Sequence, residues 1–273
     1  MEKTQKTLQI KINNTLVEEK DSTKYLGVFI DTKLNWKTQI QHIKTKLARG
    51  IGMIYRIRYF VDEACLLKMY YSFVQSHVNY NLINWSCTKK SFLEPIEKKM
   101  KKAIRIISYS KTRFEHTDPL YKQHKILNFS QLITLRKATF MWKVQYGYQP
   151  ITLSRLFVAN TQNPLKFVLP HPKNDKDKLQ IITSSIKAGN TVPDVIKPIT
   201  IYSSFVRKYK EYLIDPQSLH SNQPSNNNNH NRNGSNAYNG IQALRRGRNN
   251  YGRLDNNWEG RRLVRWENQL PTV

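Results

Sequence analysis

Carboxylate pairs and cysteine–histidine sets are the groups in this sequence whose types and spacing suit chemistry. Asp175 and Asp177 form its only Asp-x-Asp, the kind of pair that holds a divalent cation. They lie in a Lys-rich segment flanked by Pro, where two carboxylates are typically solvated charges, so we assign them no catalytic role. Cys65, His77 and Cys87 match no known zinc-ligand spacing. The sequence therefore predicts no catalytic residue and no metal site in this chain.

Basic side chains dominate the composition. The 273 residues include 45 Lys or Arg but only 19 Asp or Glu, which gives a formal net charge of +26. So large an excess repels itself in a folded protein and favours a polyanionic partner. Phosphate backbones are the first candidate, because each phosphate neutralised by Lys or Arg releases a counterion. The alternative is that the lysines form ordinary solvated helix faces, which increase solubility.

The composition changes after Asp215. All eight basic residues of 216–273 are Arg, and the same segment contains fourteen Asn. Such a segment buries too little apolar surface to offset its chain entropy, so the sequence predicts a disordered Asn/Arg-rich tail. A short basic helix is expected within it, at Trp258–Leu270. The tail's arginines, densest at Arg245–Arg248, are candidates for binding single-stranded RNA.

Apolar stretches in the chain are short. The longest, Ile51–Val61, is interrupted by Arg56 and Arg58, so no membrane-spanning helix and no membrane partner are expected. The N-terminal residues lack the apolar core of a signal peptide, and two cysteines are too few for a disulfide scaffold. We therefore expect an intracellular protein, in the nucleus or the cytoplasm, that is not secreted.

Residues 7–30 show the alternation typical of a small antiparallel β-meander. Asn13-Asn14 favours a tight turn, and Leu16-Val17 begins the return strand. The apolar run Tyr25–Ile30 predicts a third strand that is buried on both faces. Gly27, in the middle of this run, predicts a bulge or a close approach of another group to the backbone.

Helical periodicity begins at Trp36 and continues to about residue 215. Asp62 is placed to cap a second helix that ends near Asn81. Pro95 suits the first turn of a third helix, which starts at about Phe92, and Ser130 is placed to cap a fourth. The first helix carries five apolar residues at the spacing of one helical face: Ile40, Ile43, Leu47, Ile51 and Ile54.

The predicted fold is therefore mainly α. A β-meander precedes a helical bundle, a further helical extension follows the bundle, and the disordered tail ends the chain. The corresponding segments are 1–35, 36–110, 111–215 and 216–273.

Four segments carry a likeness to a known family. Lys24–Trp36 reads KYLGVFIDTKLNW, and Leu66–His77 resembles the pattern LYxSLIxPH. Leu93–Ile107 resembles the helix LQNRAxRII, and Phe205–Leu213 resembles the pattern FKxxLKxYL. In this order, the segments resemble the part of non-LTR (LINE, jockey-like) retrotransposon reverse transcriptases that follows the polymerase palm.

This resemblance implies a role in binding template–primer nucleic acid. In the family, the primer grip holds the 3′ end of the growing strand, and the thumb lays basic helices along the template–primer duplex. The resemblance implies a primer grip that includes Tyr25, Leu26 and Gly27, although simple core packing is an alternative for Tyr25 and Leu26. It implies a thumb in 36–110, with these candidates for contacting RNA or DNA: Lys37, Lys44, Lys46, Arg49, Lys98, Lys101, Lys102 and Arg105.

The palm's aromatic-x-Asp-Asp turn has no counterpart in this sequence. Polymerase chemistry needs carboxylates that converge on two metal ions, so Mg²⁺ is expected only with an upstream palm. The expected function is that of a truncated RNA-directed DNA polymerase segment, which binds template–primer but does not polymerise alone. Two alternatives stay open: a non-enzymatic nucleic-acid-binding protein derived from a retroelement, and a decayed remnant without a selected function.

Overall fold

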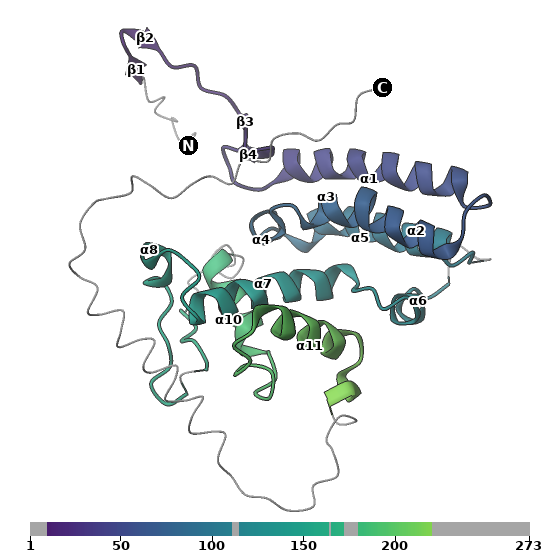
Figure 1. The fold of residues 1–273 in the computed structure, drawn as a ribbon. Coiled ribbons are helices and arrows are strands. Elements are labelled where there is room, and N and C mark those ends of the chain that lie inside the picture. The colour runs from purple at the N-terminus through teal and green to yellow at the C-terminus, as the bar shows by residue number, and fades with distance from the viewer. Residues whose placement is uncertain (1–9, 111–114, 164, 172–179, 220–273) are drawn as a thin grey trace, which may run out of the picture. The chain divides into compact units, whose positions relative to one another are not determined.

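The structure is a computed structural model, and it describes residues 10–110, 115–163, 165–171 and 180–219 (Figure 1). Contacts group the described residues into one compact unit. The first residues of the predicted tail, Pro216–Leu219, form a 3-10 turn (η2). The rest of that tail, together with Asp175 and Asp177, lies outside the described residues.

Two separate hairpins stand where the sequence predicted one meander. Strands β1 (Lys11–Ile12) and β2 (Thr15–Leu16) form the first hairpin. Its turn is Asn13-Asn14, and both residues have positive φ, as a two-residue turn of this type requires. The predicted turn is therefore confirmed.

The second hairpin corrects the prediction of a continuous strand over Tyr25–Ile30. Strands β3 (Ser22–Tyr25) and β4 (Val28–Asp31) pair antiparallel, and Leu26 and Gly27 form the turn between them, with φ of 45° and 78°. Within the run only Val28 is buried. Apolar character alone did not reveal this turn, because Leu is an unusual residue at positive φ.

Helix α1 (Lys37–Ile57) confirms the first predicted helix, since all five residues of its apolar face are buried. Helix α5 (Lys90–Ile107) packs against it. The two helices run parallel, because Lys37 lies near Phe92 at their first turns and Tyr59 lies near Tyr109 just beyond their ends. Helix α5 begins two residues earlier than expected, so Pro95 lies past its first turn.

The predicted helix from Asp62 to Asn81 is interrupted by a π turn. Asp62 caps α2 (Glu63–Tyr70) by accepting a hydrogen bond from the Cys65 N–H at 2.9 Å, as predicted. The π segment η1 (Tyr71–Gln75) and helix α3 (Ser76–Asn79) follow. The wider π turn changes which residues face the core. Phe73 is exposed, and four other residues are buried at intervals of four: Leu66, Tyr70, Val74 and Val78.

Gly50 lets α1 approach this π segment closely. A Cβ at Gly50 would lie 2.6 Å from the Phe73 carbonyl oxygen, a distance that real Cβ atoms do not adopt. Gly52, two residues further along α1, has open space around it. The close contact at Gly50 therefore depends on the absence of a side chain there.

The later helices continue the same core. Helix α7 (Phe129–Gln145) is capped by Asn128, which exchanges hydrogen bonds with Gln131, so the predicted cap at Ser130 is wrong. Asn128 is the cap because its side chain accepts a hydrogen bond from the N–H of Gln131, the third helical residue. The other helices are α4 (Leu82–Trp85), α6 (Asp118–Gln123), α8 (Ile151–Ser154), α10 (Ile181–Asn190) and α11 (Tyr202–Ile214).

One hydrophobic cluster extends from Ile40 to Tyr209 and includes residues on both sides of residue 110. A smaller cluster surrounds Met141. The mainly α fold with small antiparallel β elements at its start is confirmed. Across the described ranges, each helix is too short or too polar to cross a membrane.

Candidate nucleic-acid interface

The three primer-grip candidates form the tip of the β3–β4 hairpin. Tyr25 and Leu26 are 64% and 74% exposed, so the alternative that they pack in the core is wrong. The Tyr80 hydroxyl donates a hydrogen bond to the Leu26 carbonyl oxygen. The Tyr80 ring also lies 3.7 Å from where a Gly27 Cβ would be. The tip is thus exposed but held against the segment that joins α3 to α4.

Two further hydrogen bonds fix the hairpin and its anchor. The Phe29 N–H donates to Gln39 Oε1 at 2.9 Å, which ties β4 to the start of α1. Gln39 is only 2% exposed, so water competes little for this bond. The Trp85 Nε1–H donates to the Tyr80 carbonyl oxygen at 2.9 Å. The hairpin therefore has a defined position beside the N-terminal half of α1 (Figure 1).

Basic side chains from three segments meet beside this hairpin. Lys24 of β3 lies over the Phe29 ring, 5.8 Å from its centroid, and the Phe29 and His42 rings are 5.1 Å apart. Lys46 and Arg49 follow His42 along α1 and act electrostatically on it, as does His77 of α3. We call this group the hairpin-side cluster: Lys24, His42, Lys46, Arg49 and His77.

Electrostatics in the hairpin-side cluster disfavour further positive charge. Burial lowers the pKa of His42 below its ordinary value, and Lys46, Lys24, His77 and Arg49 lower it further. Burial also lowers the pKa of His77, with a second contribution from Lys46. Among the residues that the structure describes, every charged neighbour that shifts these two pKa values is basic. A bound anion would relieve this repulsion, so the cluster suits phosphate groups.

A second basic group lies between α1 and α5. Burial lowers the pKa of Lys99, and the ammonium groups of Lys102 and Lys44 lower it further. We call Lys44, Lys99 and Lys102 the α5-side cluster. Lys37 lies seven residues before Lys44 on α1. Its Nζ is 5.5 Å from the centroid of the Phe92 ring. The two clusters share helix α1, which carries Lys44 in one and Lys46 in the other.

The remaining predicted binding residues have protein partners. Lys98 Nζ lies 3.6 Å from Glu94, and Lys101 Nζ lies 2.7 Å from Glu97. Arg105 donates from Nε and Nη2 to the Glu115 carbonyl oxygen, at 3.0 and 2.8 Å. The structure therefore brings Lys46 and Arg49 into one cluster and Lys44 and Lys102 into the other. Lys98, Lys101 and Arg105 lie beside carboxylate or carbonyl acceptors, and Lys44 donates to the neutral Gln41 Oε1 at 2.9 Å.

Sequence reasoning missed four members of these clusters: Lys24, His42, His77 and Lys99. His42 was recognisable, because residues 42, 46 and 49 fall on one helical face. Lys24 faces the same region because it pairs with Phe29 in the hairpin register. His77 and Lys99 lie on other helices, and no local pattern in the sequence indicated their neighbours.

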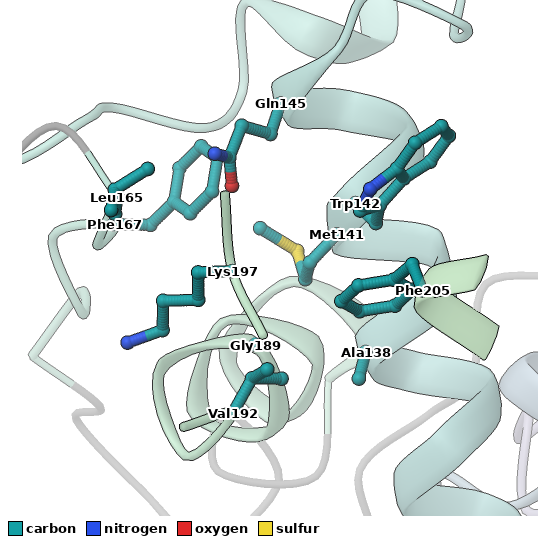
Figure 2. A pocket seen from close by; sticks show the side chains of 10 residues that line it. All are labelled: Ala138, Met141, Trp142, Gln145, Leu165, Phe167, Gly189, Val192, Lys197 and Phe205. Atoms are coloured by element: carbon teal, nitrogen blue, oxygen red, sulfur yellow. The ribbon is translucent and has the colours of Figure 1, made fainter. Parts of the chain in front are cut away.

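A small pocket lies between α7, α10 and the segment around Lys197 (Figure 2). Its lining is mostly apolar, and its free space is about that of one water molecule. The Lys197 ammonium group is engaged by Asp194 Oδ1 at 2.8 Å and by the Asn190 carbonyl oxygen at 3.4 Å. Gln145 Nε2 is buried without a hydrogen-bond partner. This pocket resembles a packing gap more than a substrate site.

Comparison of the chain with protein-family models, curated proteins and solved structures returns no match. Among the residues that the structure describes, no three His, Cys, Asp or Glu side chains gather as metal ligands would. The candidate site therefore consists of the exposed hairpin tip and the two basic clusters.

Proposed function

We propose that this chain binds a nucleic-acid duplex through phosphate contacts, as the primer-grip and thumb part of a reverse transcriptase whose catalytic palm is elsewhere. The hairpin-side cluster is the observation that carries the proposal. It joins basic groups from β3, α1 and α3, and every charged neighbour that shifts the pKa of its histidines is basic.

Physical chemistry supports a duplex as the ligand. Double-helical RNA and RNA–DNA hybrids are recognised mainly through backbone position, with little reading of base edges. Lysines on rigid helices are suited to this task, because they supply charge at defined positions without demanding a base sequence. An exposed hairpin tip beside such a surface is placed to contact the end of one strand.

Salt titration tests the proposal. Binding of a labelled RNA–DNA hybrid is measured by fluorescence anisotropy as the salt concentration is raised. We expect log K to fall with log salt at a slope steeper than about −2.7, which corresponds to three phosphates on a B-form duplex. A slope near zero on every duplex tried would contradict the proposal.

Two further experiments address the alternatives. Primer extension by the purified chain with Mg²⁺ and deoxynucleotides is expected to be absent, and extension would contradict the proposal that this chain does not polymerise alone. The tail, in which every basic residue is Arg, favours the second candidate, a non-enzymatic retroelement-derived binding protein. Loss of binding when 216–273 is deleted would support that candidate. Binding by the truncated chain, residues 1–215, would support the first candidate.

Duplex affinity is expected to rise as the pH falls through and below 6.5, the ordinary pKa of histidine. In the free protein the pKa values of His42 and His77 are lowered, so the folded state holds fewer protons than the unfolded state and loses stability below that pH. Bound phosphates favour the protonated imidazoles and reverse this effect. The pH dependence of the duplex affinity should therefore be steeper for the wild type than for a His42→Gln/His77→Gln variant. Identical profiles would exclude the histidines from the interface.

A further inference from the structure

Exposed aromatic side chains gather at the C-terminal end of α1. Tyr55 and Tyr59 are 54% and 71% exposed, and the next residue, Phe60, is 85% exposed. The Arg58 guanidinium lies 4.6 Å from the centroid of the Tyr55 ring and 4.5 Å from that of the Tyr59 ring. We call Tyr55, Arg58, Tyr59 and Tyr109 the aromatic–arginine patch.

Contacts from the turn that follows α5 hold this patch in place. Tyr109, which follows α5, lies 6.2 Å from Tyr59 between ring centroids, and its hydroxyl donates to the Arg58 carbonyl oxygen. Arg58 also donates from Nη2 to the Tyr59 hydroxyl. Exposed rings that are fixed by neighbours lose little conformational entropy when a ligand stacks on them.

The patch continues the α5-side cluster along the two parallel helices. Lys44 and Tyr55 are separated by eleven residues of α1, or about 17 Å at the helical rise of 1.5 Å per residue. This distance matches about five nucleotides of a stacked strand, at about 3.4 Å each. A strand whose phosphates contact Lys44, Lys99 and Lys102 would therefore reach the rings with its next nucleotides.

The charges of the patch favour nucleic acid over an apolar protein segment. Arg58 carries a positive charge between the two rings, and Arg56 lies in the same helical turn. The two carboxylates that follow are engaged elsewhere: Asp62 caps α2, and Glu63 Oε1 lies 3.2 Å from His124 Nδ1. Bases stack on tyrosine rings and on guanidinium planes, and this recognition tolerates any sequence.

We propose that the aromatic–arginine patch stacks the unpaired bases of a single-stranded extension on the nucleic acid whose phosphates the α5-side cluster binds. This inference rests on the proposed function and adds the class of substrate. The preferred ligand is a duplex that continues into a single strand. Such a ligand would place paired nucleotides along the lysines and unpaired ones on the rings.

Three anisotropy probes test this inference: a blunt duplex, the same duplex with a single-stranded purine extension, and the same duplex with an abasic extension of equal length. The last two have the same phosphates and differ in the presence of bases that can stack. We expect about tenfold tighter binding of the purine extension than of the abasic one, since stacking of one base accounts for a factor of that order. Equal affinities for the two would overturn the inference, and this result is also expected if the patch binds a protein instead.

Matched variants locate the effect. Tyr55→Leu/Tyr59→Leu keeps the surface apolar and is expected to remove the preference for bases while leaving blunt-duplex affinity within about twofold. Tyr148→Leu, at a tyrosine that is 69% exposed after α7, should keep the preference. Retention of the preference in the double variant would exclude the patch. Failure of the wild type to bind the blunt duplex would contradict the proposed function alone, because a preference for purines over abasic sites would still support stacking.

Discussion

Replacing Lys46 and Arg49 with glutamate is expected to weaken duplex binding by about tenfold to a hundredfold, and to make the salt dependence shallower by about one unit of slope for each lost phosphate contact. Both residues belong to the hairpin-side cluster, where every charged neighbour that shifts the His42 pKa is basic. Neither side chain is part of the buried core, since Lys46 is half-buried and Arg49 is exposed. Anisotropy titrations at several salt concentrations measure both effects.

A control with the same change in net charge separates position from total charge. Lys98→Glu/Lys101→Glu alters two lysines that already lie beside Glu94 and Glu97. Their ammonium groups add little net positive field, so this variant is expected to lose less affinity than the first. Equal losses in the two variants would mean that overall charge, and not the hairpin-side cluster, determines binding.

Trp85→Ala is expected to lower the free energy of unfolding by about 3–5 kcal/mol, the usual cost of deleting a large buried aromatic side chain. Trp85 is fully buried, and its ring stacks on Phe129 at the start of α7, with 6.1 Å between centroids. It therefore joins the helices before residue 110 to those after it. Urea unfolding followed by helical circular dichroism measures the loss.

Two milder variants measure the hydrogen bonds of Trp85 and Tyr80 apart from the packing of Trp85. Trp85→Phe keeps an aromatic ring but loses the bond to the Tyr80 carbonyl oxygen, and it should cost clearly less than Trp85→Ala. Tyr80→Phe removes only the bond to Leu26 at the hairpin tip, with an expected cost of about 1 kcal/mol. A loss below about 1 kcal/mol for Trp85→Ala would contradict the shared core.

Several elements were predictable from single stretches of sequence. The apolar face of α1, the Asp62 cap and the Asn13-Asn14 turn each depend on residues within a few positions of one another. The β3–β4 turn was not predictable in this way, because Leu26 adopts a positive φ in a run that otherwise favours extended backbone. The π turn at Tyr71–Gln75 was also missed. It lies against α1 at Gly50, and no local pattern in the sequence shows this contact between separate helices.

The candidate site was predictable only in part. The i, i+4 spacing of Glu94 with Lys98 and of Glu97 with Lys101 was visible in the sequence, and it already favoured ion pairs over free cations. The meeting of Lys24 with His42 required the hairpin to fold beside α1. The exposed rings around Arg58 also come together only in the folded chain, since Tyr59 and Tyr109 are fifty residues apart in the sequence.

The sequence by itself determined the helical periodicity, the excess of positive charge and the polar turns, because backbone geometry and solvation act over a few neighbouring residues. Tertiary structure decided which cations stand together, which face carboxylates and which aromatic rings reach solvent. These outcomes depend on distances between separate helices. Such distances follow from side-chain packing in the common core, and no local spacing in the sequence encodes them.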